Sequence, residues 1–332
     1  MQAIVLEGIE QPLTLQEVPK PVAGKDEVIV RIKAASFNRR DWWIQKGLYA
    51  GLKFPIILGS DGSGIVEETG GNVDTNWKGK EVVLYPCTNW GNDERFQSKN
   101  FSIIGLPENG TFAEFVKISS ENLFLKPTHL SFEEAATLPV AGVTAFRALF
   151  FKGQLRASDK VLITGIGGGA AVFALQWALS AGAEVYVTSS SEEKINRAIV
   201  IGAKAGVNYK DADWHEQLKS KVGSFDIIID SSLGNGFEKF IELASPGARI
   251  VFYGGTAGNI PALNGRPVFW KQLNILGTTC GSPKDFSDML SFIEQHKIHP
   301  VIDAVYPFPQ AQEALREMNA RSGKFGKTVL SW

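Results

Sequence analysis

Cysteine is nearly absent from this sequence. Only Cys87 and Cys280 occur among 332 residues, which excludes a disulfide framework and any zinc site built from cysteines. Histidine is scarce as well, with four residues. Two of them, His296 and His299, have a spacing that metal ligands can use, but they flank the end of an expected helix. A solvated turn explains this pair better than a metal site.

An excess of charge of one sign and a long apolar run are also missing. The 34 Lys and Arg residues balance 35 Asp and Glu residues, so nothing indicates a basic surface for nucleic acid or an anionic membrane. No apolar run reaches the roughly 18 residues of a membrane span, and the start lacks the pattern of a secretory signal. We therefore expect a soluble cytoplasmic protein that acts on a small molecule.

The hydrophobic pattern changes along the chain and predicts two domains. Up to about residue 126, short β-branched runs alternate with Gly and Pro, which is typical of antiparallel strands, for example at 27–32, 64–68, 81–85 and 112–118. A helix is predicted over 131–151, with Ser131 and Glu134 as a capping box. Strands and helices then alternate, which predicts a doubly wound parallel sheet with strands at 160–164, 184–188, 205–208, 225–230 and 248–253.

The strand at 160–164 runs into a glycine-rich turn that opens a helix. Gly165, Gly167 and Ala170 satisfy the spacing of a dinucleotide-binding loop, in which backbone N–H groups and a positive helix end hold a pyrophosphate. A tight structural turn is the alternative. The strand before the loop, the helix after it and the βα series that follows favour a cofactor site.

The end of the next strand predicts which dinucleotide binds. NAD-binding sites carry an acidic residue there, whereas a 2'-phosphate needs hydrogen-bond donors and positive charge. Ser189, Ser190 and Lys194 follow this strand and no acid stands at its tip, so NADPH is favoured over NADH. The serines have an alternative role as caps of the next helix, for which Ser191 is the best placed.

Several motifs together resemble the medium-chain dehydrogenase/reductase superfamily, and within it the zinc-independent quinone oxidoreductase-like branch. They lie at 36–41, 54–66, 110–114, 135–145, 165–171 and 323–327, so the resemblance covers essentially the whole chain. It implies an α/β fold with a GroES-like β-rich catalytic domain at 1–126 and 282–332 and a Rossmann NADP-binding domain, a doubly wound parallel sheet, at 127–281. It also implies that the reaction takes place in the cleft between the two domains.

Relatives of this kind are often labelled zinc-type alcohol dehydrogenases, so the metal ligands have to be checked. The positions that match the catalytic ligands hold Asn38, then Ser60 followed by Asp61, then the neighbourhood of Val140. A single carboxylate does not hold zinc. The region of the structural zinc lobe contains only Cys87. We therefore expect an enzyme without a metal.

Without a Lewis acid, oxidation of an unactivated alcohol is difficult, whereas hydride transfer to an activated carbon is easier. The expected activity is an NADPH-dependent, zinc-independent oxidoreductase that reduces a quinone or an α,β-unsaturated carbonyl. Two alternatives stay open. One is an alcohol or aldehyde oxidoreductase of the same superfamily, and the other is a non-catalytic NADPH-binding protein comparable to the lens crystallins of that superfamily.

The resemblance also implies the catalytic residues, namely Asn38, Trp43, Tyr49 and Asp61. Asn38 and Tyr49 would approach nicotinamide and substrate, and Trp43 would form an apolar wall. Asn38 has an alternative role in fixing a turn, and either Trp42 or Trp43 can face the core. Asp61 is better explained as a hydrogen-bonded structural acid than as a general acid. Tyr49 is the best candidate for a proton relay, with water as the alternative.

The remaining expectations concern the cofactor, the assembly and one unusual segment. The residues implied for NADPH binding are Asn38, Thr144, Gly167, Gly168, Gly169, Ala170, Ser189, Ser190, Lys194, Tyr209, Ser232, Leu233, Tyr253, Gly254, Gly255 and Thr256. A homodimer through the strand expected at 273–278 is also implied by the resemblance. The polar segment 89–109 is longer than in compact quinone reductases, and it fits a lid or partner-binding loop as well as a zinc lobe without function.

Overall fold

The computed structural model describes residues 1–319 and 323–332 and divides them into two units. The first unit holds residues 1–141, 282–319 and 327–332, and the second holds 142–281 and 323–326. The sequence placed the start of the second domain at residue 127. In the structure, residues 127–141 belong to the first unit because α2 (Phe132–Ala136) packs against β3 (Glu27–Ser36) and β5 (Asp61–Thr69).

Antiparallel strands form most of the first unit. The apolar runs that the sequence analysis assigned to strands become β3, β5, β6 (Glu81–Leu84) and β9 (Phe115–Ser119), and β3 pairs antiparallel with β5 and β9. The other strands of this unit are β1 (Gln2–Leu6), β2 (Leu13–Glu17), β4 (Ile56–Ile57), β7 (Cys87–Thr88), β8 (Ser102–Ile103), β10 (Leu123–Leu125), β17 (Ile302–Pro307) and β18 (Lys327–Ser331). Its helices besides α2 are α1 (Arg39–Gln45), α9 (Pro283–His296) and α10 (Ala311–Asn319), with 3-10 turns at Thr75–Trp77, Ser120–Asn122 and Phe308–Gln310.

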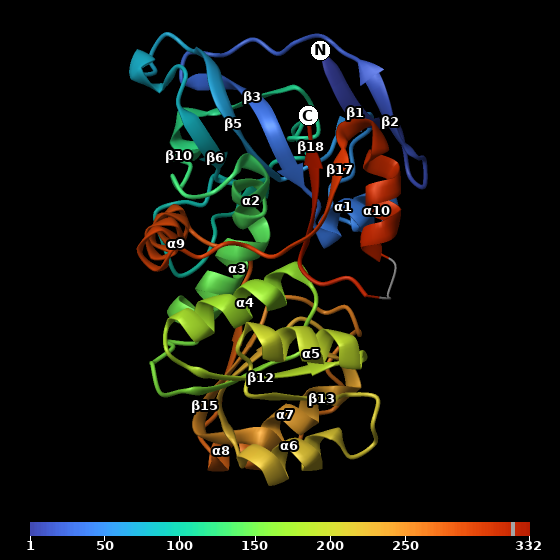
Figure 1. The fold of residues 1–332 in the computed structure, drawn as a ribbon, viewed down its shortest axis with the longest axis vertical. Coiled ribbons are helices and arrows are strands. Elements are labelled where there is room, and N and C mark those ends of the chain that lie inside the picture. Colours follow the sequence, from blue (N-terminus) through green and yellow to red (C-terminus); the bar gives the residue numbers. More distant parts are fainter. Residues whose placement is uncertain (320–322) are drawn as a thin grey trace. The chain divides into compact units, whose positions relative to one another are not determined.

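The last strand of the chain lies between β3 and β17 in the larger sheet of the first unit. β18 pairs antiparallel with β3 and parallel with β17, so the red C-terminal strand lies beside the blue strand β3 in Figure 1. The C-terminal strand thus pairs within the sheet of the first unit. It also brings Lys327, the first residue of β18, next to the end of β3.

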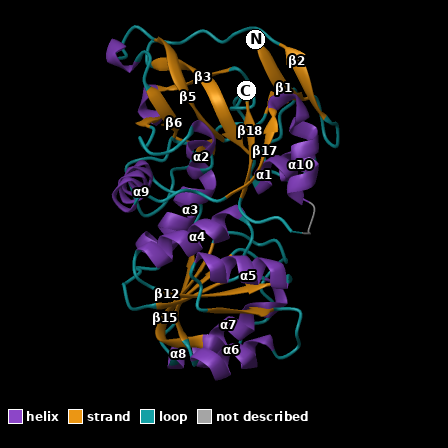
Figure 2. Cartoon of the chain, in the orientation of Figure 1, coloured by secondary structure: helices purple, strands orange, loops and turns teal. Residues whose placement is uncertain are grey.

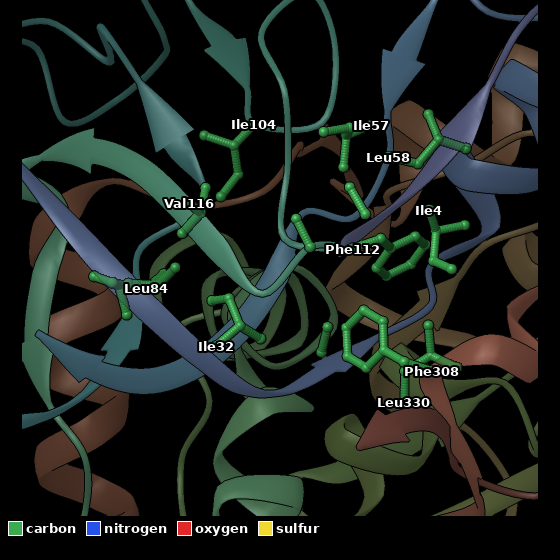
Figure 3. Packing of buried hydrophobic residues seen from close by; sticks show 14 of the residues in the cluster. Ile4, Ile32, Ile57, Leu58, Leu84, Ile104, Phe112, Val116, Phe308 and Leu330 are labelled. Atoms are coloured by element: carbon green, nitrogen blue, oxygen red, sulfur yellow. The ribbon is translucent and has the colours of Figure 1, made fainter. Parts of the chain in front are cut away.

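The core of the first unit lies between its sheets (Figure 3). Phe112 is fully buried and meets Phe37 edge to face, with 4.6 Å between the ring centroids. Ile4, Phe308 and Leu330 are buried in the same cluster, so both ends of the chain contribute to one core. Burial of each such side chain stabilises the fold by about 1.5–3 kcal/mol.

The second unit is a parallel six-stranded sheet covered by helices on both faces. The strand order is β13-β12-β11-β14-β15-β16, and Figure 2 shows α4 and α5 on one face and α6, α7 and α8 on the other. The strands are β11 (Lys160–Ile163), β12 (Glu184–Ser189), β13 (Ala205–Asn208), β14 (Phe225–Asp230), β15 (Ala244–Phe252) and β16 (Asn274–Gly277). The helices are α3 (Val143–Phe146), α4 (Gly169–Ser180), α5 (Glu192–Ile201), α6 (Trp214–Val222), α7 (Phe237–Leu243) and α8 (Gly265–Trp270), with a 3-10 turn at Gly234–Gly236. The predicted α/β class with a doubly wound sheet is confirmed.

The predicted helix over 131–151 forms, but it is not uniform. Its capping box is confirmed, because the Ser131 hydroxyl accepts a hydrogen bond from the Glu134 N–H at 3.1 Å and the Glu134 carboxylate accepts from the Ser131 N–H at 2.9 Å. Wider π-helical turns at Leu138–Gly142 and Arg147–Lys152 flank α3. The first of these contains Pro139, whose ring nitrogen has no hydrogen to donate within the helix. Among the described residues, no helix has the length and apolar character needed to cross a membrane.

Candidate functional site

The loops at the carboxyl ends of β11 and β14 meet at the middle of the parallel sheet. Chain connections run from β11 outward to β12 and β13 on one side, and from β14 outward to β15 and β16 on the other. Such a reversal is where open α/β sheets bind their ligands. It places the predicted glycine loop beside the loop that contains Ser232 and Leu233.

Asp230, which ends β14, connects these two loops. Its carboxylate is fully buried and accepts hydrogen bonds from the Thr164 hydroxyl at 2.5 Å and from the Leu233 N–H at 2.7 Å. The Ser232 N–H and hydroxyl also donate to it, at 3.0 and 2.8 Å. The sequence analysis missed Asp230. An acid that ends an otherwise apolar strand was the signal that could have identified it.

The glycine loop leaves the backbone at the start of α4 open. Gly165 has φ 62° and Gly167 has φ 120°, which are conformations that glycine adopts without strain. The N-cap of α4 is Gly168, which has no side chain that could cap the first N–H groups of the helix. A Cβ atom on Gly165 or Gly168 would find no atom within 4 Å. Open N–H groups at a helix N-terminus fit the pyrophosphate of a dinucleotide.

The serines after β12 differ in their surroundings. Ser189 is 3% exposed, and its hydroxyl donates to the Ile166 carbonyl at 3.4 Å and accepts from the Ser191 N–H at 3.3 Å. Ser191 caps α5 as expected, since its hydroxyl accepts from the Lys194 N–H at 3.4 Å. Ser189 therefore shapes the loop, whereas Ser190 is only partly buried.

Three basic residues belong to segments next to the glycine loop. A Cβ atom on Gly167 would lie 2.7 Å from Cδ of Lys194, so the aliphatic part of this lysine passes over the loop. Arg197, one turn further along α5, donates to the Gly323 carbonyl at 3.2 Å and lies over the Phe325 ring. The segment that carries Lys324 is bound to the loop, because the Gly326 N–H donates to the Gly167 carbonyl at 3.1 Å. The sequence analysis assigned no role to Arg197 or Lys324.

The other residues predicted to bind the cofactor follow the carboxyl ends of neighbouring strands. Tyr209 comes after β13 and is 45% exposed. The predicted stretch from Tyr253 to Thr256 comes after β15, and the Thr256 N–H donates to the Ser231 carbonyl at 3.5 Å. Thr144 differs from the rest, since it lies buried on α3.

A buried polar centre occupies the first unit where β3, β5 and β18 meet. The Lys327 ammonium donates to the Asn38 Oδ1 at 2.7 Å, to the Phe37 carbonyl at 2.6 Å and to the Asp61 Oδ2 at 3.0 Å. The side chains of Lys327 and Asp61 are 4% and 0% exposed. Two residues predicted to be catalytic, Asn38 and Asp61, are thus joined by a lysine that the sequence analysis quoted only as part of a motif.

The Asp61 carboxylate accepts hydrogen bonds from three different groups. Besides Lys327, its carboxylate accepts from the Ser36 hydroxyl at 2.8 Å and from the Val140 N–H at 2.8 Å. A carboxylate that is 0% exposed and accepts three hydrogen bonds orders its surroundings. Its geometry agrees with the structural alternative rather than with a general acid.

Arg40 occupies the space next to Ser60. Its guanidinium donates to the Ser60 hydroxyl at 2.5 Å and to the Ile104 carbonyl at 2.8 Å, and it lies 5.2 Å from the centre of the Tyr49 ring. The Ile104 carbonyl belongs to the segment 89–109. Trp90, Ile104 and Leu106 of this segment are buried, so the segment is packed into the first unit and holds Arg40 in place.

The paired tryptophans on α1 have different environments. Trp42 packs against the core cluster of the first unit together with Tyr49, and both are partly buried. Trp43 is also partly buried, and its ring meets Trp42 edge to face at 4.7 Å. Trp43 is not among the residues of that core cluster, and its role as the wall of a binding site stays a prediction.

The residues at the expected zinc positions do not fit a zinc ion. Within residues 1–319 and 323–332, no group of three or more His, Cys, Asp and Glu side chains could hold a metal. Ser60 stands at one ligand position and is bonded to a guanidinium, and Asp61 is paired with an ammonium. Positive groups at both places oppose the binding of a divalent cation.

Comparisons with known proteins agree with this architecture. Residues 24–128 match the family model of the alcohol dehydrogenase GroES-like domain, and residues 169–295 match that of the zinc-binding dehydrogenase. A solved structure described as a NAD-dependent alcohol dehydrogenase superimposes with a TM-score of 0.93 and 36% identity, covering 100% of both chains.

Curated relatives match over nearly their full lengths. The zinc-type alcohol dehydrogenase-like protein YogA of Leptosphaeria maculans is 36% identical, covering 96% of this chain and 94% of its own. Acryloyl-coenzyme A reductase of Sulfurisphaera tokodaii is 31% identical, covering 99% of both. The quinone oxidoreductase of Mus musculus is 29% identical, covering 97% of this chain and 95% of its own.

Asp41 gives the polar centre a dependence on pH. Burial raises the pKa of its carboxyl from 3.8 to about 6, although the nearby Arg40 and the Asn38 N–H, which it accepts at 2.7 Å, lower it. A carboxyl whose pKa is higher in the folded state stabilises the fold most below the unfolded value. That stabilisation is lost as the pH rises through the folded value.

Asp41→Asn should therefore gain stability relative to the wild type as the pH rises from about 3 to about 7. The shift of Asp41 from 3.8 to about 6 corresponds to a relative gain of about 3 kcal/mol. Urea unfolding of both proteins across this range measures the difference, and groups common to both cancel. A difference that stays constant over this range would contradict the prediction.

Proposed function

Since the chain belongs to the medium-chain dehydrogenase/reductase superfamily and is an oxidoreductase, we propose that it is an NADPH-dependent, zinc-independent reductase of quinones or α,β-unsaturated carbonyl compounds. The observation that carries this proposal is the set of side chains at the expected metal positions. Asn38 and Ser60 are bonded to the cations Lys327 and Arg40. These groups suit hydrogen bonding to an oxygen and do not suit a metal.

In the second unit, the open N–H groups of the glycine loop would hold the pyrophosphate of the cofactor. Lys194, Arg197 and Lys324 offer positive charge for a 2'-phosphate, and Ser190 offers a hydroxyl. Tyr209 and the stretch 253–256 would line the adenosine and nicotinamide sides. When bound, reduced nicotinamide supplies a hydride.

In the first unit, the residues of α1 and the turn after it would meet the substrate. Trp43 presents a partly buried aromatic surface for a flat acceptor. Asn38 would donate a hydrogen bond to the acceptor oxygen as it gains negative charge, and Tyr49 would pass a proton to it. The relatives named quinone oxidoreductase and acryloyl-coenzyme A reductase support these two acceptor classes.

A panel of acceptors tests the proposal directly. We expect the purified protein to oxidise NADPH with a benzoquinone or an α,β-unsaturated ketone, and to do so equally well after treatment with EDTA and phenanthroline. A primary alcohol with NADP⁺ serves as the comparison and should react far more slowly. Alcohol oxidation that the chelators abolish would favour the alcohol dehydrogenase alternative, and binding of NADPH without turnover would favour the non-catalytic one.

Lys194→Ala tests the choice of cofactor. Loss of one charge-assisted hydrogen bond is worth about 1.5–3 kcal/mol, so the Kd for NADPH should rise about ten- to hundredfold while the Kd for NADH stays unchanged. Lys221→Ala, an exposed lysine in the last turn of α6, is the matched control. Equal losses for NADPH and NADH in Lys194→Ala would argue against a 2'-phosphate site.

We also propose a homodimer in which β16 pairs with the same strand of a second copy. β16 is the edge strand of the parallel sheet, and Phe269 and Trp270 on the preceding helix are 68% and 82% exposed. An edge strand next to large exposed apolar side chains favours association. Light scattering at micromolar concentration should give twice the chain mass, and a monomeric mass would count against the dimer.

A further inference from the structure

We propose that Lys327 is a positioning residue that makes Asn38 a hydrogen-bond donor toward the carbonyl or quinone oxygen of the substrate. This inference rests on the proposed reductase function. The observation behind it is the state of the Asn38 side-chain nitrogen. Asn38 is 8% exposed, and its Nδ2 is buried without a hydrogen-bond partner among the residues that the structure describes.

The orientation of the Asn38 amide follows from the chemistry of its neighbour. A lysine ammonium has three donors and no acceptor, so the amide atom that faces it must be the oxygen. That oxygen lies 2.7 Å from the Lys327 Nζ. The NH₂ group is then turned away from Lys327, and it can only donate. The Lys327 ammonium and the Asp41 N–H of the α1 capping box both face the amide oxygen, so Lys327 reinforces an orientation that the start of the helix also favours.

Lys327 is itself held in one place. Its three donors are used by the Phe37 carbonyl, Asn38 Oδ1 and Asp61 Oδ2. Asp61 is in turn held by the Ser36 hydroxyl and the Val140 N–H. The backbone of Asn38 is fixed separately, since its N–H donates to Asp41. Both ends of Asn38 are therefore anchored before any ligand arrives.

The geometry fits a substrate oxygen that gains negative charge. A preorganised donor in a site shielded from water stabilises such an oxygen more in the transition state than in the ground state. The effect should therefore fall on kcat. A carbonyl or quinone oxygen accepts from NH₂, whereas a substrate group that must donate would find no acceptor on Asn38.

A double-mutant cycle tests the proposal. In wild-type background, Lys327→Met should lower kcat with the best acceptor of the panel about ten- to hundredfold while the Kd for NADPH stays within about twofold. Asn38→Leu should lower kcat about a hundredfold. In the Asn38→Leu background, Lys327→Met should have almost no further effect, because its role is exerted through Asn38.

Two further variants keep the test decisive. Lys126→Met removes another buried lysine of the same unit, 6% exposed, and should leave kcat unchanged. Lys327→Met leaves Asp61 buried and unpaired, which can prevent folding. The combined Lys327→Met/Asp61→Asn variant removes both charges together, and it should show the same loss of kcat and the same dependence on Asn38.

The outcomes separate this proposal from the proposed function. If the wild type reduces the acceptors but the folded Lys327 variants keep full kcat, or lose the same factor with Asn38→Leu as without it, Lys327 does not act through Asn38. A wild type that reduces no quinone or enone would overturn the reductase function and, with it, this assignment.

Discussion

The buried ion pair between Lys327 and Asp61 organises the first unit. It connects the last strand of the chain to β5, and through Phe37 and Asn38 it reaches the end of β3. Taking both charges out of water is costly, and the pair is tolerated because Lys327 donates three hydrogen bonds and the Asp61 carboxylate accepts three. The start of α1, and with it Trp43 and Tyr49, depends on this arrangement.

A buried carboxylate has a similar part in the second unit. The Asp230 carboxylate accepts hydrogen bonds from hydroxyl and backbone N–H groups. These bonds hold the loops after β11 and β14 at the point where the sheet order reverses. Each unit therefore contains a buried acid that orders the backbone around it. The unpartnered Asn38 Nδ2 lies in the first unit, and the glycine N-cap of α4 lies in the second.

Arg40 links α1 to two other parts of the first unit. Ser60 is bonded to Arg40, and the carbonyl of Ile104 holds the same guanidinium. The segment 89–109 thus contributes to the polar centre through its backbone, which explains why its polar composition gave no indication of its role. Its buried residues Trp90 and Leu106 anchor it. The Arg40 guanidinium thus supplies a positive charge next to Ser60.

The sequence by itself determined the local structure: the capping box of Ser131 and Glu134, the glycine loop and the alternation of strands and helices. These features arise from contacts between residues a few positions apart, and their spacing is written directly in the chain. Only the tertiary structure decided that Lys327 meets Asp61, 266 positions away, and that Asp230 meets Thr164, 66 positions away. No periodicity encodes such pairs, because they form only when separate strands pack side by side. The orientation of the Asn38 amide depends on another such long-range contact, the hydrogen bond from Lys327 to Asn38 Oδ1.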